Sequence, residues 1–179
     1  MGRPLRFLVV CTGNICRTPM AVHFLTAAAT EAGLEIVVTS SGFLTTDQPA
    51  SPTVREVMGE RGADLSAHRS RISTPEMLAE ADLVLAMERH HARDLVLMEP
   101  GSSSKIHTFG GAVALLEALP EGHLAPAEKL ERISHGRQAS DFLGVGDDEV
   151  ADPYGRSMRV NRQTADRLQE LSGRLIAAL

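Results

Sequence analysis

The chain has 179 residues, of which 43% are apolar and only 3% aromatic, with no Trp. This length fits one domain, 1–179, and is enough to bury a core built from Leu, Val, Ile, Met and Ala. The formal net charge of −5 and the scattered basic residues argue against a general nucleic-acid-binding protein, which carries a basic patch.

The first third of the chain alternates short apolar runs with helix signals. Leu5–Val10 is predicted to be a buried strand that leads into a loop. Thr18 and Pro19 are predicted to open a helix, with Thr18 as its N-cap and Gly33 as its end. Glu35–Ser40 is predicted to be the second strand.

The same signals recur along the rest of the chain. The expected helices begin at Ser51-Pro52, with a stop at Gly62, and at Thr74-Pro75, and others cover Glu88–Val96, Ala112–Leu119 and Arg156–Leu179. The expected strands are Asp82–Met87 and Lys105–Phe109. Strands that alternate with helices predict an α/β fold whose parallel sheet is covered on both faces.

The region Gly110–Val150 is less regular than the rest of the chain. It combines the predicted helix with several prolines and glycines, among them Pro120, Pro126 and Gly136. No change in composition is strong enough to mark a second domain, so a single domain is expected.

One motif carries chemistry. Residues 11–18 read CTGNICRT, a C-x5-R-[ST] pattern between a predicted strand and a predicted helix. Backbone N–H groups from Thr12 to Thr18 can cradle an anion there, aided by the helix N-terminus and by the close approach that Gly13 allows. Arg17 offers a planar fork for two phosphoryl oxygens, and Cys11 offers a thiolate nucleophile.

A bare C-x5-R pattern occurs by chance, and Cys11 alone could be an inert core cysteine. The surrounding residues decide between these interpretations. Cys11–Pro19, CTGNICRTP, closely resembles the signature of the low-molecular-weight protein tyrosine phosphatases, with Thr18 in place of the commoner Ser. Ser40-Ser41-Gly42, Ala63–Ser73 and Ala81–Met87 resemble further landmarks of that family. Gly110–Val150 is longer than is usual in that family, so the resemblance implies an insertion within 110–150 of the single domain.

This resemblance implies a phosphotyrosine phosphatase I-like fold, a three-layer sandwich with a four-stranded parallel sheet in the order 2-1-3-4. It implies hydrolysis of phosphate monoesters, with protein phosphotyrosine as the expected substrate, through a cysteinyl-phosphate intermediate. Asp152-Pro153-Tyr154 resembles the acid loop, so Asp152 is expected to protonate the leaving oxygen and then to activate water. Without the resemblance, Asp-Pro is a common turn start, and Asp141, Asp147 and Asp148 would compete with Asp152.

The resemblance also implies roles for neighbouring residues. Asn14 shapes the loop and hydrogen-bonds the Thr18 hydroxyl, which in turn reaches the Cys11 sulfur. Cys16 is either a partner that traps oxidised Cys11 as a disulfide or a small buried hydrophobe. The substrate pocket is expected to contain Ile15, Phe43 and Tyr154, with Leu44 as an alternative to Phe43.

We expect no cofactor and no metal. The residues His68, His90, His91, His107, His123 and His135 form no metal-ligand pattern, and His90-His91 is expected on a solvated helix surface. The expected partner is a phosphotyrosine-containing protein, without nucleic acid or membrane, while the oligomeric state stays open. Met1–Arg6 is too short and too polar for a signal peptide, so a cytoplasmic protein is expected.

Three alternatives remain. An arsenate reductase of the same fold needs further cysteines to relay oxidation, and Met87–Met98 contains none. A phosphoarginine phosphatase carries Thr where Ile15 stands, and Ile suits an aromatic substrate better. A catalytically weak phosphate-binding module is disfavoured by the presence of Cys11, Arg17 and Asp152 together.

Overall fold

Four parallel strands form one sheet in the order β2-β1-β3-β4, as the resemblance predicted. The structure is a computed structural model that describes residues 3–120, 122–136 and 147–179. The strands are β1 (Leu5–Val10), β2 (Ile36–Ser41), β3 (Leu83–Ala86) and β4 (Ile106–Thr108). Their last residues are in register, with Val10 beside Ser41 and Ala86, and Ala86 beside Thr108. The segments that follow the strands therefore meet at one edge.

Seven α-helices and one 3₁₀ helix occupy the described ranges. They are α1 (Arg17–Glu31), α2 (Pro52–Gly59), α3 (Pro75–Glu80), α4 (Arg89–Met98), η1 (Pro100–Lys105), α5 (Phe109–Glu117), α6 (Pro126–Ser134) and α7 (Met158–Ala177). The side chains of Ser51 and Thr74 cap α2 and α3, as their Ser-Pro and Thr-Pro pairs predicted.

One predicted helix start is wrong. Helix α1 begins at Arg17, with Cys16 in the N-cap position and no side-chain cap. Thr18 therefore lies inside the first turn, where its buried hydroxyl accepts a hydrogen bond from Asn14. The competing hydrogen bond removes Thr18 from the capping role that its sequence context suggested.

The region 110–150 contains a helix that the sequence did not predict. At the start of α6, the Glu128 carboxylate accepts a hydrogen bond from the Ala125 N–H at 2.8 Å. Leu130 and Ile133 are buried in the core. Asp141 lies outside the described residues, and the length of this region relative to the family stays a prediction.

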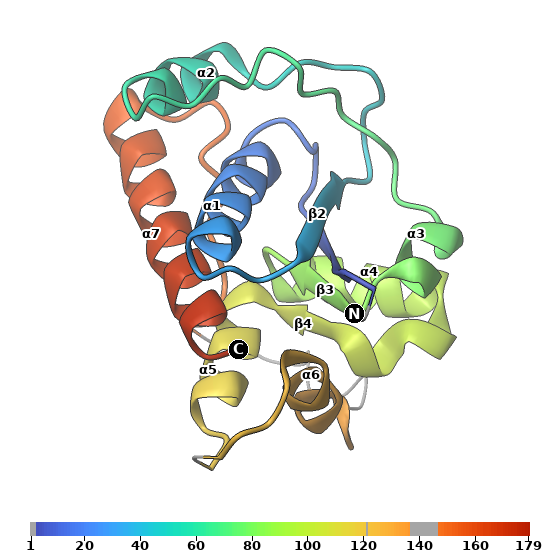
Figure 1. Cartoon of the computed structure of the whole chain (residues 1–179). Helices are drawn as coiled ribbons and strands as arrows, with labels where there is room; N and C mark the ends of the chain where they lie inside the picture. Colours follow the sequence, from blue (N-terminus) through green and yellow to red (C-terminus); the bar gives the residue numbers. More distant parts are fainter. Residues whose placement is uncertain (1–2, 121, 137–146) are drawn as a thin grey trace.

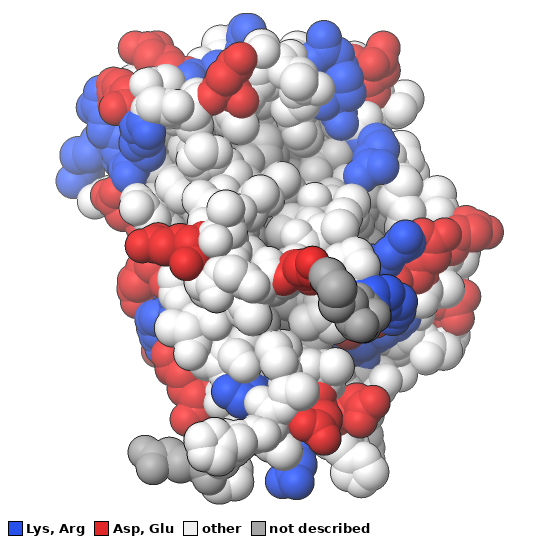
Figure 2. All heavy atoms as spheres, in the orientation of Figure 1, with Lys and Arg blue, Asp and Glu red and all other residues white. Residues whose placement is uncertain are grey.

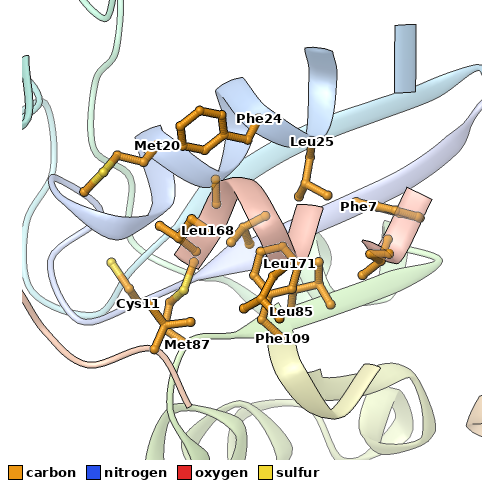
Figure 3. Packing of buried hydrophobic residues seen from close by; sticks show 14 of the residues in the cluster. Phe7, Cys11, Met20, Phe24, Leu25, Leu85, Met87, Phe109, Leu168 and Leu171 are labelled. Carbon is orange, nitrogen blue, oxygen red and sulfur yellow. The ribbon is translucent and has the colours of Figure 1, made fainter. Parts of the chain in front are cut away.

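The sheet separates two apolar layers (Figure 1). Phe7 and Val9 of β1 pack with buried residues of α1, α5 and α7, whereas Leu8 and Val10 pack with those of α3 and α4. This alternation follows from the period of two along a strand. Figure 3 shows the larger layer, where Phe7 and Leu85 of the sheet meet helix residues such as Leu168.

Charged side chains of both signs are dispersed over the face seen in Figure 2, without a large basic patch. Among the described residues, no helix combines the length and apolarity needed to cross a membrane.

Candidate active site

The predicted site residues gather at the carboxyl edge of the sheet, where open α/β sheets bind ligands. The loop of residues 11–16 joins the end of β1 to α1. Gly42 follows β2, and its carbonyl oxygen accepts from the N–H of Ser73 at 2.7 Å. Glu88 follows β3, and Val150 donates its N–H to the Met87 carbonyl oxygen at 2.7 Å. Segments distant in sequence thus converge around Cys11.

Asn14 fixes the shape of the loop. Its backbone is left-handed, with φ of 53°, a conformation that Asn tolerates better than most residues. Its fully buried side chain donates to the Thr18 hydroxyl at 2.8 Å and to the Ser40 hydroxyl at 2.9 Å. Its Oδ1 accepts from the Arg71 N–H at 2.8 Å. These bonds tie the loop to α1, β2 and the segment around residue 71.

Two further features constrain the same loop: the close approach of Gly42 and a hydrogen bond from His68. A Cβ at Gly42 would lie 2.8 Å from the Asn14 nitrogen and 2.9 Å from the Cys11 and Thr12 carbonyl oxygens, so only glycine fits there. His68 donates from Nε2 to the Asn14 carbonyl oxygen at 2.6 Å. The loop is therefore held in place before any ligand arrives.

The loop has backbone N–H groups that are available to a ligand. Within the described part of the chain, the backbone N–H groups of residues 12–16 donate to no other protein group. The Cys11 sulfur is 3.7 Å from the Thr18 hydroxyl, and Cys11 is 2% exposed. Unused N–H groups at a helix N-terminus form an anion site.

Arg17 is a buried cation, only 1% exposed. Its Nη1 donates to the Glu88 carboxylate at 2.7 Å and to the Val150 carbonyl oxygen at 2.9 Å. Its Nη2 lies 3.3 Å from both the Thr12 hydroxyl and the Asp152 carboxylate. Its Nε has no hydrogen-bond partner among the described residues, so the Nε–Nη2 edge of the fork suits an anionic ligand.

Asp152 lies beside this guanidinium and remains 43% exposed, so it can meet both substrate and water. Its Oδ1 accepts from the Tyr154 N–H at 3.1 Å. Of the competing carboxylates, Asp147 is exposed. Asp148 is bound by Thr108 and Arg89, and despite the opposing effect of burial these hydrogen bonds hold the pKa of Asp148 below its usual value. Of these described carboxylates, Asp152 is the one that lies beside Arg17, and its role as the acid stays a prediction.

The three predicted pocket residues differ in their surroundings. Ile15 is half-buried against the core. Phe43 is half-buried and donates its N–H to the Thr12 carbonyl oxygen at 2.8 Å, which holds it beside the loop. Leu44 is 68% exposed, which favours Phe43 over this alternative, and Tyr154 is 66% exposed on the acid loop.

Sequence reasoning missed Glu88 and His91. His91 was expected on a solvated surface but is 1% exposed, because its ring packs under Phe43 and its Nε2 lies 2.8 Å from the Thr12 hydroxyl. His90 is exposed, as predicted. The available signal was their position directly after β3, at the edge where the strands end.

Glu88, His90 and His91 hold possible metal-ligand atoms within 4.8 Å of one another, a cluster that the sequence did not predict. However, the Glu88 carboxylate already pairs with Arg17 at 2.7 Å. A metal ion would place a second positive charge against that buried guanidinium, so the cluster fits the ion pair better than a metal.

Cys16 is buried and donates from its sulfur to the Ser51 hydroxyl at 3.4 Å. Burial raises the pKa of the Cys16 thiol to about 11. Both cysteines are free thiols. A disulfide between Cys11 and Cys16 after oxidation stays a prediction, and the protonated Cys16 thiol would form it slowly.

Comparisons with known proteins identify relatives of this chain. The model of the family described as low molecular weight phosphotyrosine protein phosphatase matches residues 6–115. A probable low molecular weight protein-tyrosine-phosphatase, EpsP of Ralstonia solanacearum, is 36% identical over 103 residues, 58% of this chain and 69% of the relative. A protein-arginine-phosphatase of Bacillus subtilis is 31% identical over 173 residues, 96% of this chain and 95% of the relative.

Similar solved structures include a tyrosine phosphatase and an arginine phosphatase. A low molecular weight protein tyrosine phosphatase from T. tengcongensis has a TM-score of 0.74 and 33% identity, covering 98% of this chain and 99% of its own. A cysteine-to-serine mutant of the YwlE arginine phosphatase, with a phosphorylated active-site serine, has a TM-score of 0.75 and 28% identity. It covers 97% of this chain and 94% of its own.

Proposed function

The chain belongs to the low molecular weight protein tyrosine phosphatase family and is a phosphatase, and we propose that it hydrolyses phosphotyrosine in proteins. The observation that carries this proposal is the buried Arg17, whose Nε has no hydrogen-bond partner among the described residues and which ends a loop that begins at Cys11 and contains unused N–H groups. Such a site binds a phosphoryl group and presents a sulfur nucleophile to it.

In the first step, the Cys11 thiolate attacks phosphorus and the bond from phosphorus to the tyrosine oxygen breaks. Asp152 gives its proton to that oxygen, so neutral tyrosine leaves and a cysteinyl phosphate remains. Arg17 and the N–H groups of the loop bind the three other phosphoryl oxygens. The short distance between Asp152 and Arg17 supports this assignment, because it brings the acid to the bound phosphoryl group.

In the second step, Asp152 takes a proton from water as the water oxygen attacks phosphorus. The sulfur–phosphorus bond breaks, inorganic phosphate leaves and the Cys11 thiolate is restored. The Thr18 hydroxyl, 3.7 Å from the sulfur, supports stabilisation of the departing thiolate. The phosphorylated active-site serine of the YwlE cysteine-to-serine mutant supports covalent transfer at the corresponding step in that relative.

Turnover of p-nitrophenyl phosphate tests the reaction. The wild-type protein should hydrolyse it, while Cys11→Ser should lose turnover and still bind inorganic phosphate. Arg17→Lys should lose most activity as well, because an ammonium group cannot form the planar fork. Full activity of Cys11→Ser would refute the cysteinyl-phosphate route.

A second candidate substrate is phosphoarginine. The B. subtilis protein-arginine-phosphatase matches nearly the whole chain. Against it stands Ile15, whose apolar side chain suits an aromatic ring better than a guanidinium group. We expect higher kcat/KM on a phosphotyrosine peptide than on a phosphoarginine peptide, and Ile15→Thr should narrow that difference. A wild-type preference for phosphoarginine would reverse the choice.

The proposed site also bears on location. A catalytic thiol needs a reducing compartment, since oxidation abolishes its nucleophilicity. We therefore place the protein in the cytoplasm, with phosphorylated proteins as its partners.

A further inference from the structure

The buried His91 side chain contacts three parts of the site. Its Nε2 lies 2.8 Å from the Thr12 hydroxyl and 3.7 Å from the Glu88 carboxylate. Its ring is stacked on Phe43, with centroids 5.7 Å apart and ring planes at 11°. The proposed mechanism, with Cys11 as nucleophile and Asp152 as acid, gives this imidazole no role.

We propose that His91 is a positioning residue for the phosphatase reaction: it aligns Arg17 through Thr12 and Glu88, and it orients Phe43 against the aryl group of the substrate. This inference rests on the proposed function, because it assumes an aryl phosphate. The proposal assigns one effect to the contacts of His91 with Thr12 and Glu88, and a second effect to its stacking on Phe43.

The first effect passes through a closed ring of four side chains. Arg17 donates from Nη1 to Glu88 at 2.7 Å, and its Nη2 donates to the Thr12 hydroxyl at 3.3 Å. His91 Nε2 lies near the same carboxylate and the same hydroxyl. His91 and Arg17 therefore share both partners, and the imidazole holds these partners where they keep the guanidinium fork turned toward the anion loop.

The second effect passes through the stacked ring. Phe43 is anchored at its backbone by the hydrogen bond to the Thr12 carbonyl oxygen. One face of its half-buried ring rests on His91, which is almost fully buried. The stacked imidazole therefore fixes the orientation of the Phe43 ring beside the loop.

The surroundings keep the imidazole neutral. Its Nδ1 is buried and has no hydrogen-bond partner among the described residues. A proton on Nε2 would face the Glu88 carboxylate and the Thr12 hydroxyl, while a second proton on Nδ1 would be left without an acceptor. A neutral ring adds no charge repulsion to the nearby Arg17.

Two substitutions separate the two effects. His91→Phe keeps a flat ring under Phe43 and removes the hydrogen bond to Thr12. His91→Asn keeps a donor near Thr12 and removes the ring. Thr12→Val removes the hydroxyl and leaves His91 itself unchanged, so it tests the first effect even if a variant at His91 folds poorly.

Binding is measured by calorimetry with inorganic phosphate and with phenylphosphonate, which differ by the aryl ring. His91→Phe and Thr12→Val should weaken phosphate binding about tenfold, the loss of one hydrogen bond of about 1.4 kcal/mol. They should preserve the ratio between the two affinities. His91→Asn should preserve phosphate binding and reduce the advantage of phenylphosphonate about fivefold, within the range of an aromatic contact. The kcat and KM values for p-nitrophenyl phosphate should divide the variants into the same two groups, with His91→Phe and Thr12→Val in one group and His91→Asn in the other.

His90→Asn is the matched control, because His90 is the exposed neighbour, and it should change neither affinity. Equal losses for both ligands in all variants at His91, or no loss in any of them, would overturn the inference. A wild-type protein that binds phosphate without turning over p-nitrophenyl phosphate would refute the proposed function instead. The binding ratios would then still decide whether His91 positions Arg17 and Phe43.

Discussion

Arg17 is the residue on which the site depends, because a buried cation is tolerated only when it is paired. Glu88, Asp152, Thr12 and the Val150 carbonyl oxygen surround its two terminal nitrogens. These partners come from three segments of the chain, since Val150 and Asp152 are close in sequence. This pairing leaves Nε without a partner among the described residues. The contacts that offset burial of the charge therefore also set the orientation in which the guanidinium group would meet a ligand.

Asp152→Asn should leave the anion loop intact and slow turnover, because the amide cannot deliver a proton. We expect a loss of about 10²–10⁴-fold with phenyl phosphate, the usual contribution of general acid–base catalysis. The loss should be smaller with p-nitrophenyl phosphate, whose leaving group departs more easily without a proton. Steady-state kinetics on both substrates measures the difference.

The competing carboxylates provide the control for this experiment. If Asp152→Asn kept full activity toward phenyl phosphate while Asp141→Asn, Asp147→Asn or Asp148→Asn lost it, the acid would come from the preceding region. The assignment of Asp152 would then be wrong.

His91 should make the stability of the protein depend on pH. Burial, together with the positive charges of His90 and Arg17, lowers the pKa of His91 from 6.5 to about 3, and the nearby Glu88 does not reverse this. Between these values the unfolded chain binds a proton that the folded chain does not. Stability should therefore fall as the pH falls from 6.5 toward 3.

Urea unfolding at about pH 7.5 and about pH 5 should show this loss, with His91 contributing about 2 kcal/mol of it. His91→Asn removes the titrating group and should reduce the difference between the two pH values by that amount. An equal pH dependence of the wild type and this variant would mean that His91 is protonated in the folded state.

At this scale the sequence predicted residues that belong to a contiguous motif. Cys11, Arg17 and Thr18 lie within eight positions, and the physical role of each follows from its neighbours. Glu88 and His91 were missed because their contacts with Arg17 and Thr12 span 71 and 79 positions. Only the parallel register, which brings the ends of β1 and β3 together, makes them neighbours.

Among the elements, the segment before the acid loop is fastened to the sheet edge by three consecutive residues. The Asp148 carboxylate accepts from the Thr108 hydroxyl and from Arg89 at 2.9 and 3.0 Å. The Glu149 carboxylate accepts from the Arg89 N–H at 2.7 Å, and Val150 pairs with Met87 and Arg17. These contacts join α4, β4 and α1, and they set where the chain reaches Asp152.

Asp148→Asn should loosen this fastening by removing a charge that pairs with Arg89. We expect kcat toward phenyl phosphate to fall about threefold to tenfold, roughly the effect of one charge-assisted hydrogen bond, with little change in phosphate affinity. Asp147→Asn is the matched control, because Asp147 is the exposed neighbour. Equal kinetics for the two variants would show that Asp148 does not position the acid loop.

Elements were predicted best where local signals were unambiguous. The apolar runs gave the four strands, and Ser51 and Thr74 marked helices that they do cap. Helix α6 was missed because Pro126 and the surrounding glycines suggested a loop. In fact Pro126 opens the helix, and burial of Leu130 and Ile133 stabilises it, a tertiary contact that no local pattern reveals.

Across the whole molecule, α7 unites parts of the chain that are far apart in sequence. Its buried face contributes Leu168 and Leu171 to the same core layer as Phe7 of β1 and Leu25 of α1 (Figure 3). Leu175 of the same helix also belongs to this layer. The N-terminal loop that is proposed to bind the anion therefore packs on a core that the C-terminal helix completes. Folding of the site should depend on α7, although α7 supplies none of the proposed catalytic groups.

A pair of leucine substitutions tests this dependence. Leu168 is fully buried, so Leu168→Ala should lower the free energy of unfolding by about 2–5 kcal/mol through lost burial and the cavity left behind. Leu97 is 80% exposed on α4, so Leu97→Ala should change the free energy of unfolding by less than about 0.5 kcal/mol. In urea, loss of helical signal and loss of phosphate binding should coincide for Leu168→Ala, because one core supports both the sheet and the anion loop. Phosphate binding that outlasts the unfolding of α7 would show that the site is stable without this helix.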